Sequence, residues 1–385
     1  MGKLNSIQSL RAVAAIMVFL CHLFAMEGAH SGRFEKLTDF WVNGAHGVDL
    51  FFVISGFVIV WVASDVQIGW RGAVDFLAAR IARIYPLWWL FAGATSFMLW
   101  VAYGTPWQPE RMIEHDMVGP THVIESFLLL PQAHHPVLGV GWTLVHEMYF
   151  YAAFALLILI LPASRRLLGV LIWGALVTLG AGLGFTAEFA DSISKLVFYP
   201  MTLQFIAGAL VAFLIKSKVR RFARISIAIG VIGWVATYLE LHSDSASALF
   251  SMFEFDALTN AFFAWRRTVL FGIPSTFLVY GLVAWELREG ARKRMPNPLV
   301  PLGNWSYSIY LCHVPVISVV NRLIYRPFDA DQVWVVGAYL ITATLATLTV
   351  AGITYYVFER PSIIWFGRIR SRMLQRSDSP FAPSN

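Results

Sequence analysis

Charged residues are scarce in this 385-residue sequence, and cysteine is nearly absent. Only 14% of the residues are Asp, Glu, Lys or Arg, whereas 58% are hydrophobic and 15% are aromatic. A soluble domain carries charge on about a quarter of its residues. The composition therefore excludes an ordinary soluble fold and indicates a protein that crosses a membrane several times.

The two cysteines, Cys21 and Cys312, are too few for a disulfide framework. Each precedes a histidine, His22 or His313, and the two pairs resemble parts of a zinc site. Adjacent residues of a helix point about 100° apart, however, so neither pair offers two ligands to one ion. We therefore expect no metal cofactor. A cysteine acyl carrier at Cys21 is also disfavoured, because no neighbour favours its thiolate.

Several apolar runs are long enough to cross a hydrocarbon core of about 30 Å. We expect an all-α polytopic membrane bundle with ten helices, at residues 7–26, 47–64, 84–103, 142–161, 167–186, 197–215, 225–240, 268–286, 303–324 and 333–357. The first run lacks the features of a cleaved signal peptide, so we expect a retained anchor. Residues 1–366 form the transmembrane domain, and 367–385 form a basic, partly disordered tail. The long loops 104–141 and 241–267 are expected to cover a site.

The positions of the basic residues predict the orientation of the chain. With the N-terminus inside, 21 of the 29 Lys and Arg residues fall in cytoplasmic segments. Positive charge in short loops marks the cytoplasmic side, so both termini are expected to be cytoplasmic. The net charge of +6 then reflects the basic cytoplasmic segments of a protein in a lipid bilayer. We expect no nucleic-acid partner.

Two ionisable residues in apolar spans are candidates for catalysis. His22 lies three turns beyond Arg11 in the first span, and Glu147 lies about one and a half turns inside the fourth. A buried ionisable group is costly and needs a partner, so we expect Glu147 to orient the His22 imidazole at the same depth. A histidine that only packs against another helix is the alternative. His146, next to Glu147, faces elsewhere.

Arg80 and Arg83 lie three residues apart, hence on one helix face, at the start of the third span. Ordinary positive-inside anchoring explains most such arginines. Apolar residues on both sides favour a second interpretation, in which the two guanidinium groups bind the phosphates of a cytoplasmic donor.

Other polar residues in the spans are candidates for supporting roles. Asp49, at the expected outer entrance of the second span, is a possible partner of His22 or Arg33, while Ser55 and Gly56 favour close helix packing. Tyr310 and His313 lie beside Pro315, which is expected to kink the ninth span, and they make either a local polar contact or part of a substrate channel. Glu359 is expected to pair with a loop arginine at the inner surface.

Six segments in this order resemble the membrane acyltransferase 3 family, from about residue 4 to 366: LRAVAAIMVFLCH, GVDLFFVISGF, FLAARIARIYPLWW, GWTLVHEMYFY, SYSIYLCH and FERP. The third and fourth are most similar to the branch of bacterial exopolysaccharide O-acetyltransferases. The resemblance implies a multi-pass protein of the bacterial inner membrane. Such a protein moves an acyl group, usually acetyl, from cytoplasmic acyl-CoA to a carbohydrate acceptor such as an exopolysaccharide or lipopolysaccharide.

The resemblance also implies roles for particular residues. His22 and Glu147 would be catalytic, and acyl-CoA would be bound by Arg80, Arg83 and Arg11. Candidate substrate contacts or supporting residues are Asp49, Ser55, Trp142, Tyr149, Tyr310 and His313. His146 departs from the family pattern, which has a small or polar residue there, and this change bears on how the acceptor fits.

Two alternatives from other classes stay open on the residues alone. In a polysaccharide-precursor flippase or proton-coupled transporter, His22 and Glu147 would form a proton relay without thioester cleavage. A scaffold for polysaccharide assembly would leave the buried charges unexplained.

Overall fold

A computed structural model describes residues 3–29, 35–105, 119–186, 191–241, 261–288, 298–324, 328 and 332–377, and this part of the chain contains helices and no strand. The longer helices are α1 (Asn5–Gly28), α2 (Glu35–Val42), α3 (Gly47–Ala63), α4 (Trp70–Ala102), α6 (Pro120–Leu128), α7 (Trp142–Ile160), α8 (Arg166–Gly182), α10 (Thr202–Lys216), α11 (Ala223–Leu241), α14 (Ile273–Arg288), α15 (Leu299–Ile324), α16 (Val333–Thr354) and α17 (Arg360–Ser377). Short helices are α9 (Ser192–Val197) and α13 (Ala261–Arg267), with π-helical turns at Thr268–Gly272 and Tyr355–Glu359.

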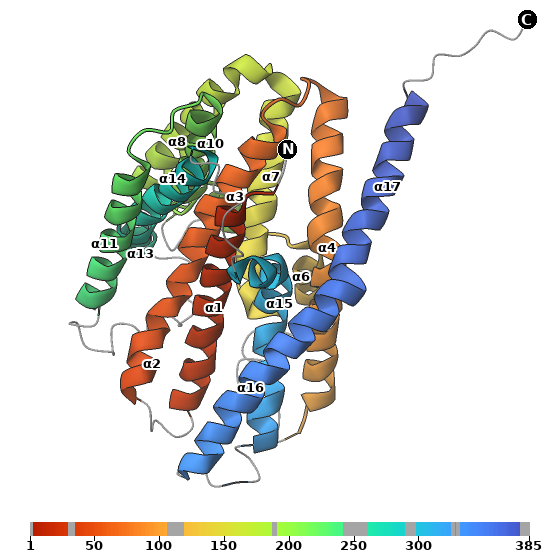
Figure 1. Cartoon of the computed structure of the whole chain (residues 1–385). Coiled ribbons are helices and arrows are strands. Elements are labelled where there is room, and N and C mark those ends of the chain that lie inside the picture. Colours follow the sequence, from red (N-terminus) through yellow and green to blue (C-terminus); the bar gives the residue numbers. More distant parts are fainter. Residues whose placement is uncertain are drawn as a thin grey trace, which may run out of the picture.

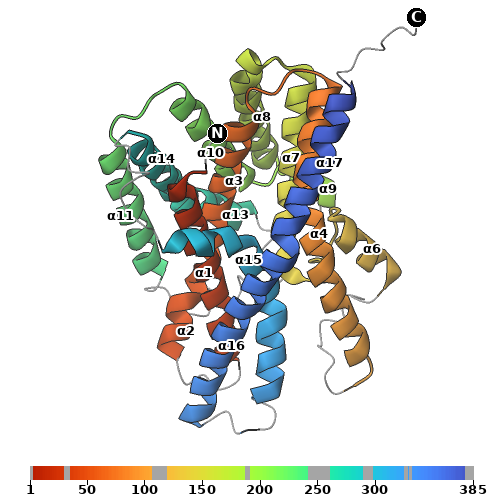
Figure 2. The ribbon, with the colours of Figure 1, turned by 45° about the vertical axis from the view of Figure 1, so that its right-hand side comes forward.

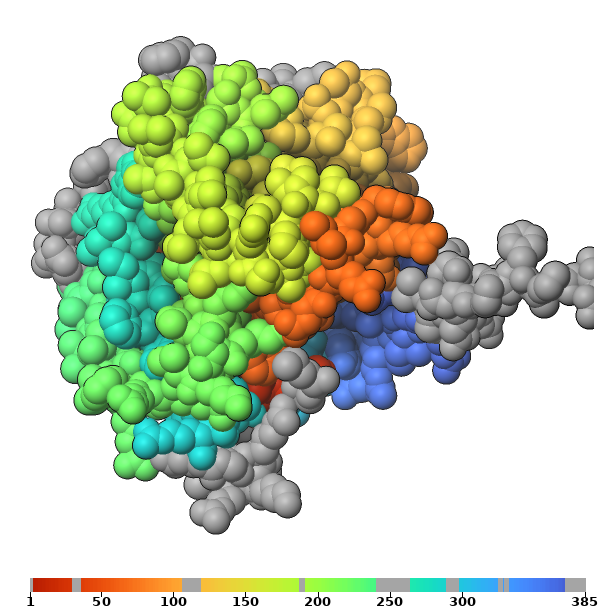
Figure 3. Space-filling model, turned by 90° about the horizontal axis from the view of Figure 1, so that it is seen from above, coloured from red at the N-terminus to blue at the C-terminus, as the bar shows by residue number. Residues whose placement is uncertain are grey.

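The predicted polytopic α-helical membrane bundle is confirmed. Nine helices of the described residues are long and apolar enough to cross a membrane, and a shorter apolar helix covers Ala223–Leu239, where the seventh span was expected. In Figure 1 the start of α1 and the far end of α17 both lie toward the top of the bundle. Seen from that end, in Figure 3, helices drawn in orange, yellow-green, green and blue surround a small patch of red that belongs to α1.

Several span boundaries differ from those expected. The third span begins at Trp70, so Arg80 and Arg83 lie inside a continuous helix and not at its start. The last span runs on from α16 through a π-helical turn into α17, which continues to Ser377. The first part of the expected tail 367–385 is therefore helical, and residues 378–385 lie outside the described residues.

The second span begins at Lys36, well before the expected start at residue 47. A short 3-10 turn, Asn43–His46, joins α2 to α3. Its Gly44 lies against the backbone of α1 at Met17, in the middle of that helix. His46 and Asp49 are therefore buried within this span and do not lie at its beginning, where they were expected.

Glycines allow two pairs of helices to touch through their backbones. A Cβ on Gly56 of α3 would lie 1.8 Å from the carbonyl oxygen of Phe205, and one on Gly208 of α10 would lie 1.9 Å from that of Val53. A Cβ on Gly303 of α15 would lie 1.9 Å from the carbonyl oxygen of Gln8 in α1. Small residues permit such contacts between membrane helices. The packing role expected for Gly56 is confirmed, whereas Ser55 lines a cavity.

The N-terminus of α1 is capped by a carboxylate from another helix. Leu4, at the N-cap position, supplies no side-chain bond. The backbone N–H groups of Asn5 and Ser6 donate to Glu286 of α14 at 3.0 and 2.9 Å, and the Ser6 hydroxyl donates at 2.5 Å. Glu286 thus satisfies free N–H groups and complements the positive end of the helix dipole.

A buried arginine closes the C-terminus of α3 in a similar way. Arg166, which is fully buried, donates to the carbonyl oxygens of Ala63 at 3.2 Å and Ser64 at 2.6 Å, and also to that of Val66. Ala63 is the last residue of α3, and its carbonyl also accepts from the N–H of Val66 at 3.2 Å, while Ser64 and Val66 follow the helix. Arg166 therefore joins the start of α8 to the end of α3.

The helix α15 is bent, as its Pro315 predicted. Figure 2 shows its first part crossing the bundle and its second part turning to run beside α16. A proline inside a helix removes one backbone hydrogen bond and so favours a kink. On the outside of the bundle, α17 lies along α4, where Arg370 forms an ion pair with Asp75.

The glycine contacts predict large effects from a single methyl group. Gly208→Ala should destabilise the protein by about 1–3 kcal/mol, the usual cost of overpacking, because its Cβ meets a backbone oxygen. Gly337→Ala is the matched control, since no atom lies within 4 Å of its Cβ. Thermal unfolding in detergent measures both. Equal melting temperatures for the two variants would contradict the contact between α3 and α10.

Candidate active site

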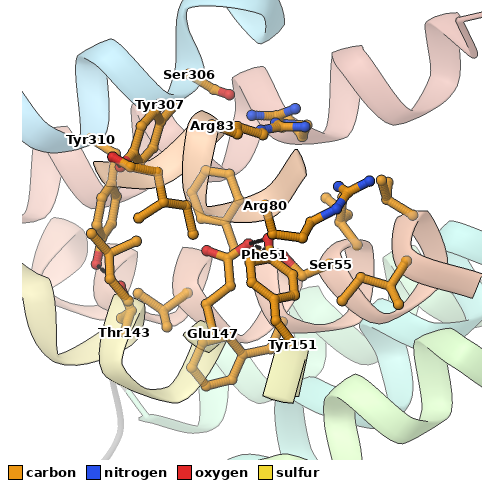
Figure 4. A pocket seen from close by; sticks show the side chains of 18 residues that line it. Phe51, Ser55, Arg80, Arg83, Thr143, Glu147, Tyr151, Ser306, Tyr307 and Tyr310 are labelled. Carbon is orange, nitrogen blue, oxygen red and sulfur yellow. Dashed lines mark hydrogen bonds between the residues drawn. The ribbon is translucent and has the colours of Figure 1, made fainter. Parts of the chain in front are cut away.

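A cavity lies inside the bundle between α1, α3, α4, α7 and α15. It encloses about 790 Å³ of empty space, part of it open to solvent. Apolar residues of α3 form much of one wall. The polar residues that line it are Arg11, Ser55, Arg80, Arg83, Thr143, Glu147, Tyr151, Ser306, Tyr307 and Tyr310. Most of the candidate site residues predicted from the sequence therefore share one cavity, which Figure 4 shows.

Glu147 is held in the cavity by neighbours on two helices. Tyr151, one turn further along α7, donates its hydroxyl to the Glu147 carboxylate. Ser55 of α3 donates to the same oxygen at 3.4 Å. In Figure 4 dashed lines mark the hydrogen bonds of the carboxylate with these two side chains. The spacing of four residues places Glu147 and Tyr151 on one face of α7.

Positive charge is in excess in this cavity. Arg11, Arg80 and Arg83 are all partly buried there, and Glu147 is the acidic residue among the lining side chains. No ion pair within the described part of the chain joins the three arginines to a carboxylate. The Nε atom of Arg80 is buried and has no hydrogen-bond partner among those residues. Guanidinium groups with spare donors suit an anionic ligand, above all one with phosphates.

Within the described residues, Glu359 forms no ion pair with an arginine, although one with a loop arginine was expected. Its side chain is buried and accepts a hydrogen bond from Ser308 of α15 at 2.5 Å. Arg83 and Arg11 act on it only through longer-range electrostatics. Glu359 does not line the cavity, but its negative charge offsets part of the positive charge of Arg83 and Arg11.

His22 lies against His313, a contact between the first and the ninth expected spans. The Nδ1 atom of His22 is 3.3 Å from Nε2 of His313, and the ring centroids are 4.9 Å apart. The two Nδ1 atoms also lie 2.9 Å from the carbonyl oxygen of Val18 and 3.1 Å from that of Ile309, respectively. A carbonyl only accepts, so these contacts assign the proton of each neutral ring to Nδ1. The lone pair of His22 is then on Nε2, as a general base requires.

Tyr310 connects the histidine pair to the cavity. Its ring centroid is 5.9 Å from that of His313, while its hydroxyl lies 2.9 Å from the hydroxyl of Thr143 and donates to Val140 at 3.0 Å. Tyr310 and Thr143 both line the cavity. His313 therefore lies next to a residue of the cavity wall, and His22 contacts His313.

The structure does not bring Glu147 to His22, although the two were expected to meet. Glu147 shares the cavity with Arg11, whereas His22 lies eleven residues further along α1. That separation corresponds to about 16 Å along a helix axis. The orienting partner in the described residues is His313.

Asp49 belongs to a separate buried cluster. It pairs with Arg267 at 2.7 Å and His46 at 3.1 Å, and Gln204 donates to it at 2.6 Å. The pairing with His22 is not found in the described part of the chain, and Arg33 lies outside it. Arg267 is the last residue of the loop 241–267 that was expected from the sequence. Its position in the apolar run AFFAWRRTVLFG is a signal of burial that this expectation missed.

Two further candidates lie outside the cavity. Tyr149 donates to the carbonyl oxygen of Val197 at 3.1 Å and accepts from the Trp173 indole at 3.1 Å, so it joins α7 to α8 and α9. Trp142 lines a second cavity together with His146. Of the residues that sequence reasoning missed, Tyr151 and Tyr307 stand out, since both line the first cavity.

Comparison with known proteins gives the family. A family model described as an acyltransferase domain matches residues 4–356. The chain is 32% identical to the exopolysaccharide production protein ExoZ of Rhizobium meliloti (strain 1021), over 87% of this chain and 94% of that protein.

Two other relatives carry acyltransferase names. The chain is 25% identical to the acyltransferase MdmB of Streptomyces mycarofaciens, over 96% of this chain and 94% of that one. It is 24% identical to the O-acetyltransferase OatA of Staphylococcus aureus (strain NCTC 8325 / PS 47), over 93% of this chain and 57% of that protein. No solved structure matches. The chain belongs to the membrane acyltransferase 3 family.

Proposed function

We propose that this membrane acyltransferase moves an acyl group, most simply acetyl, from acyl-CoA to a hydroxyl of an exported polysaccharide or glycolipid. The observation that carries the proposal is the arginine-rich cavity beside the His22–His313 pair. The named functions of two relatives, exopolysaccharide production and O-acetyl transfer, support the acceptor and the acyl group.

The cavity is suited to the donor. Three arginines face a space with one carboxylate, so an anion would relieve their mutual repulsion and supply the missing partner of the Arg80 Nε atom. CoA carries several phosphates on one long molecule. The pantetheine arm in extended form covers the roughly 16 Å of helix between Arg11 and His22.

In this proposal His22 acts as the general base. Its Nε2 takes the proton of the acceptor hydroxyl while the hydroxyl oxygen bonds to the thioester carbon. The carbon–sulfur bond breaks, and the proton passes from the imidazolium to the sulfur of CoA. His313 accepts from Nδ1–H of His22 and so orients the ring and stabilises its charged form, a role that the sequence assigned to Glu147.

The whole proposal is tested with purified protein and labelled acetyl-CoA. Release of the CoA thiol that depends on added glycan, with label recovered in the glycan as an alkali-labile ester, is the expected result. Transport of a lipid-linked glycan without thiol release would instead favour the transporter alternative.

His22→Ala should lower the rate of acetyl transfer by at least about 10²-fold, because it removes the base. The measurement is the initial rate of labelled ester formation at saturating donor. Cys21→Ala is the control on the same helix, because its thiol donates to the carbonyl of Val42, away from the cavity. Near-normal transfer by the His22 variant, or equal losses in both, would contradict the assignment.

Arg80→Gln and Arg83→Gln should each raise the KM for acetyl-CoA about tenfold or more, since a charged hydrogen bond contributes about 1.5–3 kcal/mol. A short thioester without phosphates, such as an acetylated N-acetylcysteamine, should be used equally well by these variants and the unmodified protein. Arg71→Gln, at an exposed position of α4, is the matched control. An unchanged KM for acetyl-CoA would mean that Arg80 and Arg83 serve only as positive-inside anchors that orient the chain in the membrane.

A further inference from the structure

A second cavity lies on the other side of the first turns of α7. It encloses about 860 Å³ of empty space, part of it open to solvent. Its walls come from residues 130–136, from the start of α7, and from α9 with Tyr199. The wall at 130–136 belongs to the loop 104–141, which the sequence predicted to cover a site.

One side of this cavity is aromatic. The imidazole of His146 is stacked on Tyr199, with ring centroids 4.9 Å apart and planes 28° from parallel. The indole of Trp142 meets the same imidazole edge to face at 5.6 Å. Flat ring faces of this kind pack against the C–H groups of a bound ring.

Polar atoms in the same cavity lack partners. His146 is 7% exposed, and its Nδ1 atom is buried without a hydrogen bond in the described residues. The amide nitrogen of Gln132 is in the same state. Buried polar groups in folded proteins almost always have partners, so two such atoms on residues that line one cavity point to a ligand with hydroxyl groups.

The charges around the second cavity argue against other ligands. Asp191 and Lys195 both line it, so neither sign of charge is in excess, in contrast to the arginine-rich cavity. A nucleotide would require surplus positive charge, and an acyl chain would require an apolar lining without unpaired polar atoms. A neutral sugar ring fits the aromatic and hydroxyl-binding character of the cavity.

The two cavities share one wall, the N-terminal part of α7. Thr143 and Glu147 line the first cavity, while Trp142 and His146 line the second. Because an α-helix is about 10–12 Å across, a ligand in one cavity is separated from the other by roughly this distance. One sugar ring in the second cavity does not itself reach the donor, so the acylated hydroxyl must belong to a neighbouring residue of the same glycan.

We propose that the cavity formed by Trp142, His146, Tyr199 and Gln132 binds a sugar residue of the acceptor next to the one that is acylated. The inference rests on the proposed function. It makes the enzyme selective for oligosaccharide or longer acceptors over monosaccharides, and it gives His146, the departure from the family pattern, a role in acceptor binding.

The test uses a de-O-acetylated exopolysaccharide hydrolysate, separated into monosaccharide and oligosaccharide fractions. His146→Phe keeps an aromatic ring but removes the nitrogen atoms. It should raise the KM for oligosaccharides about tenfold while leaving the KM for acetyl-CoA and the transfer to monosaccharides unchanged. Leu156→Ala, at an exposed position of the same helix and outside both cavities, should change none of these values. Equal effects of His146→Phe on both fractions, or no effect on either, would overturn the inference.

Binding is measured separately, on protein that carries His22→Ala and so does not turn over. Oligosaccharide binding by calorimetry should weaken about tenfold when His146→Phe is added, and unchanged binding would refute the sugar site while the proposed function stands. If the unmodified protein releases no thiol with any glycan, the proposed function fails. A loss of oligosaccharide binding in the His146 variant would still support the sugar site.

Discussion

The backbone contact between α1 and α15 is the constraint on which the site depends. Gly303 has no side chain, and its Cα lies so close to the carbonyl oxygen of Gln8 that a methyl group does not fit. This contact fixes how the two helices lie against each other. It brings His22 of α1 to His313 of α15 and places Arg11 in the same cavity as Tyr310. Within a bilayer an ionisable group has no water to pair with, so a helix pair with a defined register is what makes such a site tolerable.

Most buried charges in the bundle are compensated by protein groups, and the exceptions mark the site. Asp49 pairs with Arg267, Glu286 caps α1, and Arg166 closes α3. Each of these contacts joins helices that are distant in sequence and therefore supports the fold. The arginines of the first cavity differ, because the surrounding described residues leave their charge in excess. Because these other buried charges have protein partners, the excess charge of the cavity arginines favours a bound anionic ligand as their partner.

The sequence predicted the architecture well because apolar length is a strong signal in a bilayer, where backbone groups must be satisfied within helices. It failed at boundaries where a helix continues beyond its apolar stretch, as at Trp70 and Ser377. It also failed at the polar turn 43–46, which interrupts the apolar pattern within one span. It named Arg11, Arg80, Arg83 and Glu147 as candidates, and the structure places all four around one cavity. It could not predict their depths relative to one another, because depth depends on how helices tilt and pack. The contact of His22 with His313 joins residues 291 positions apart and has no local signal.

The helix α7 forms a wall of both cavities. Its first turns present Glu147 to one cavity and His146 to the other, so both ligands would touch the same rigid element. Any shift or rotation of α7 caused by one ligand alters the walls that meet the second. By linkage, the factor by which a bound donor changes acceptor affinity equals the factor by which the acceptor changes donor affinity. If both proposed sites are occupied, this common wall would couple the affinities of donor and acceptor through one helix.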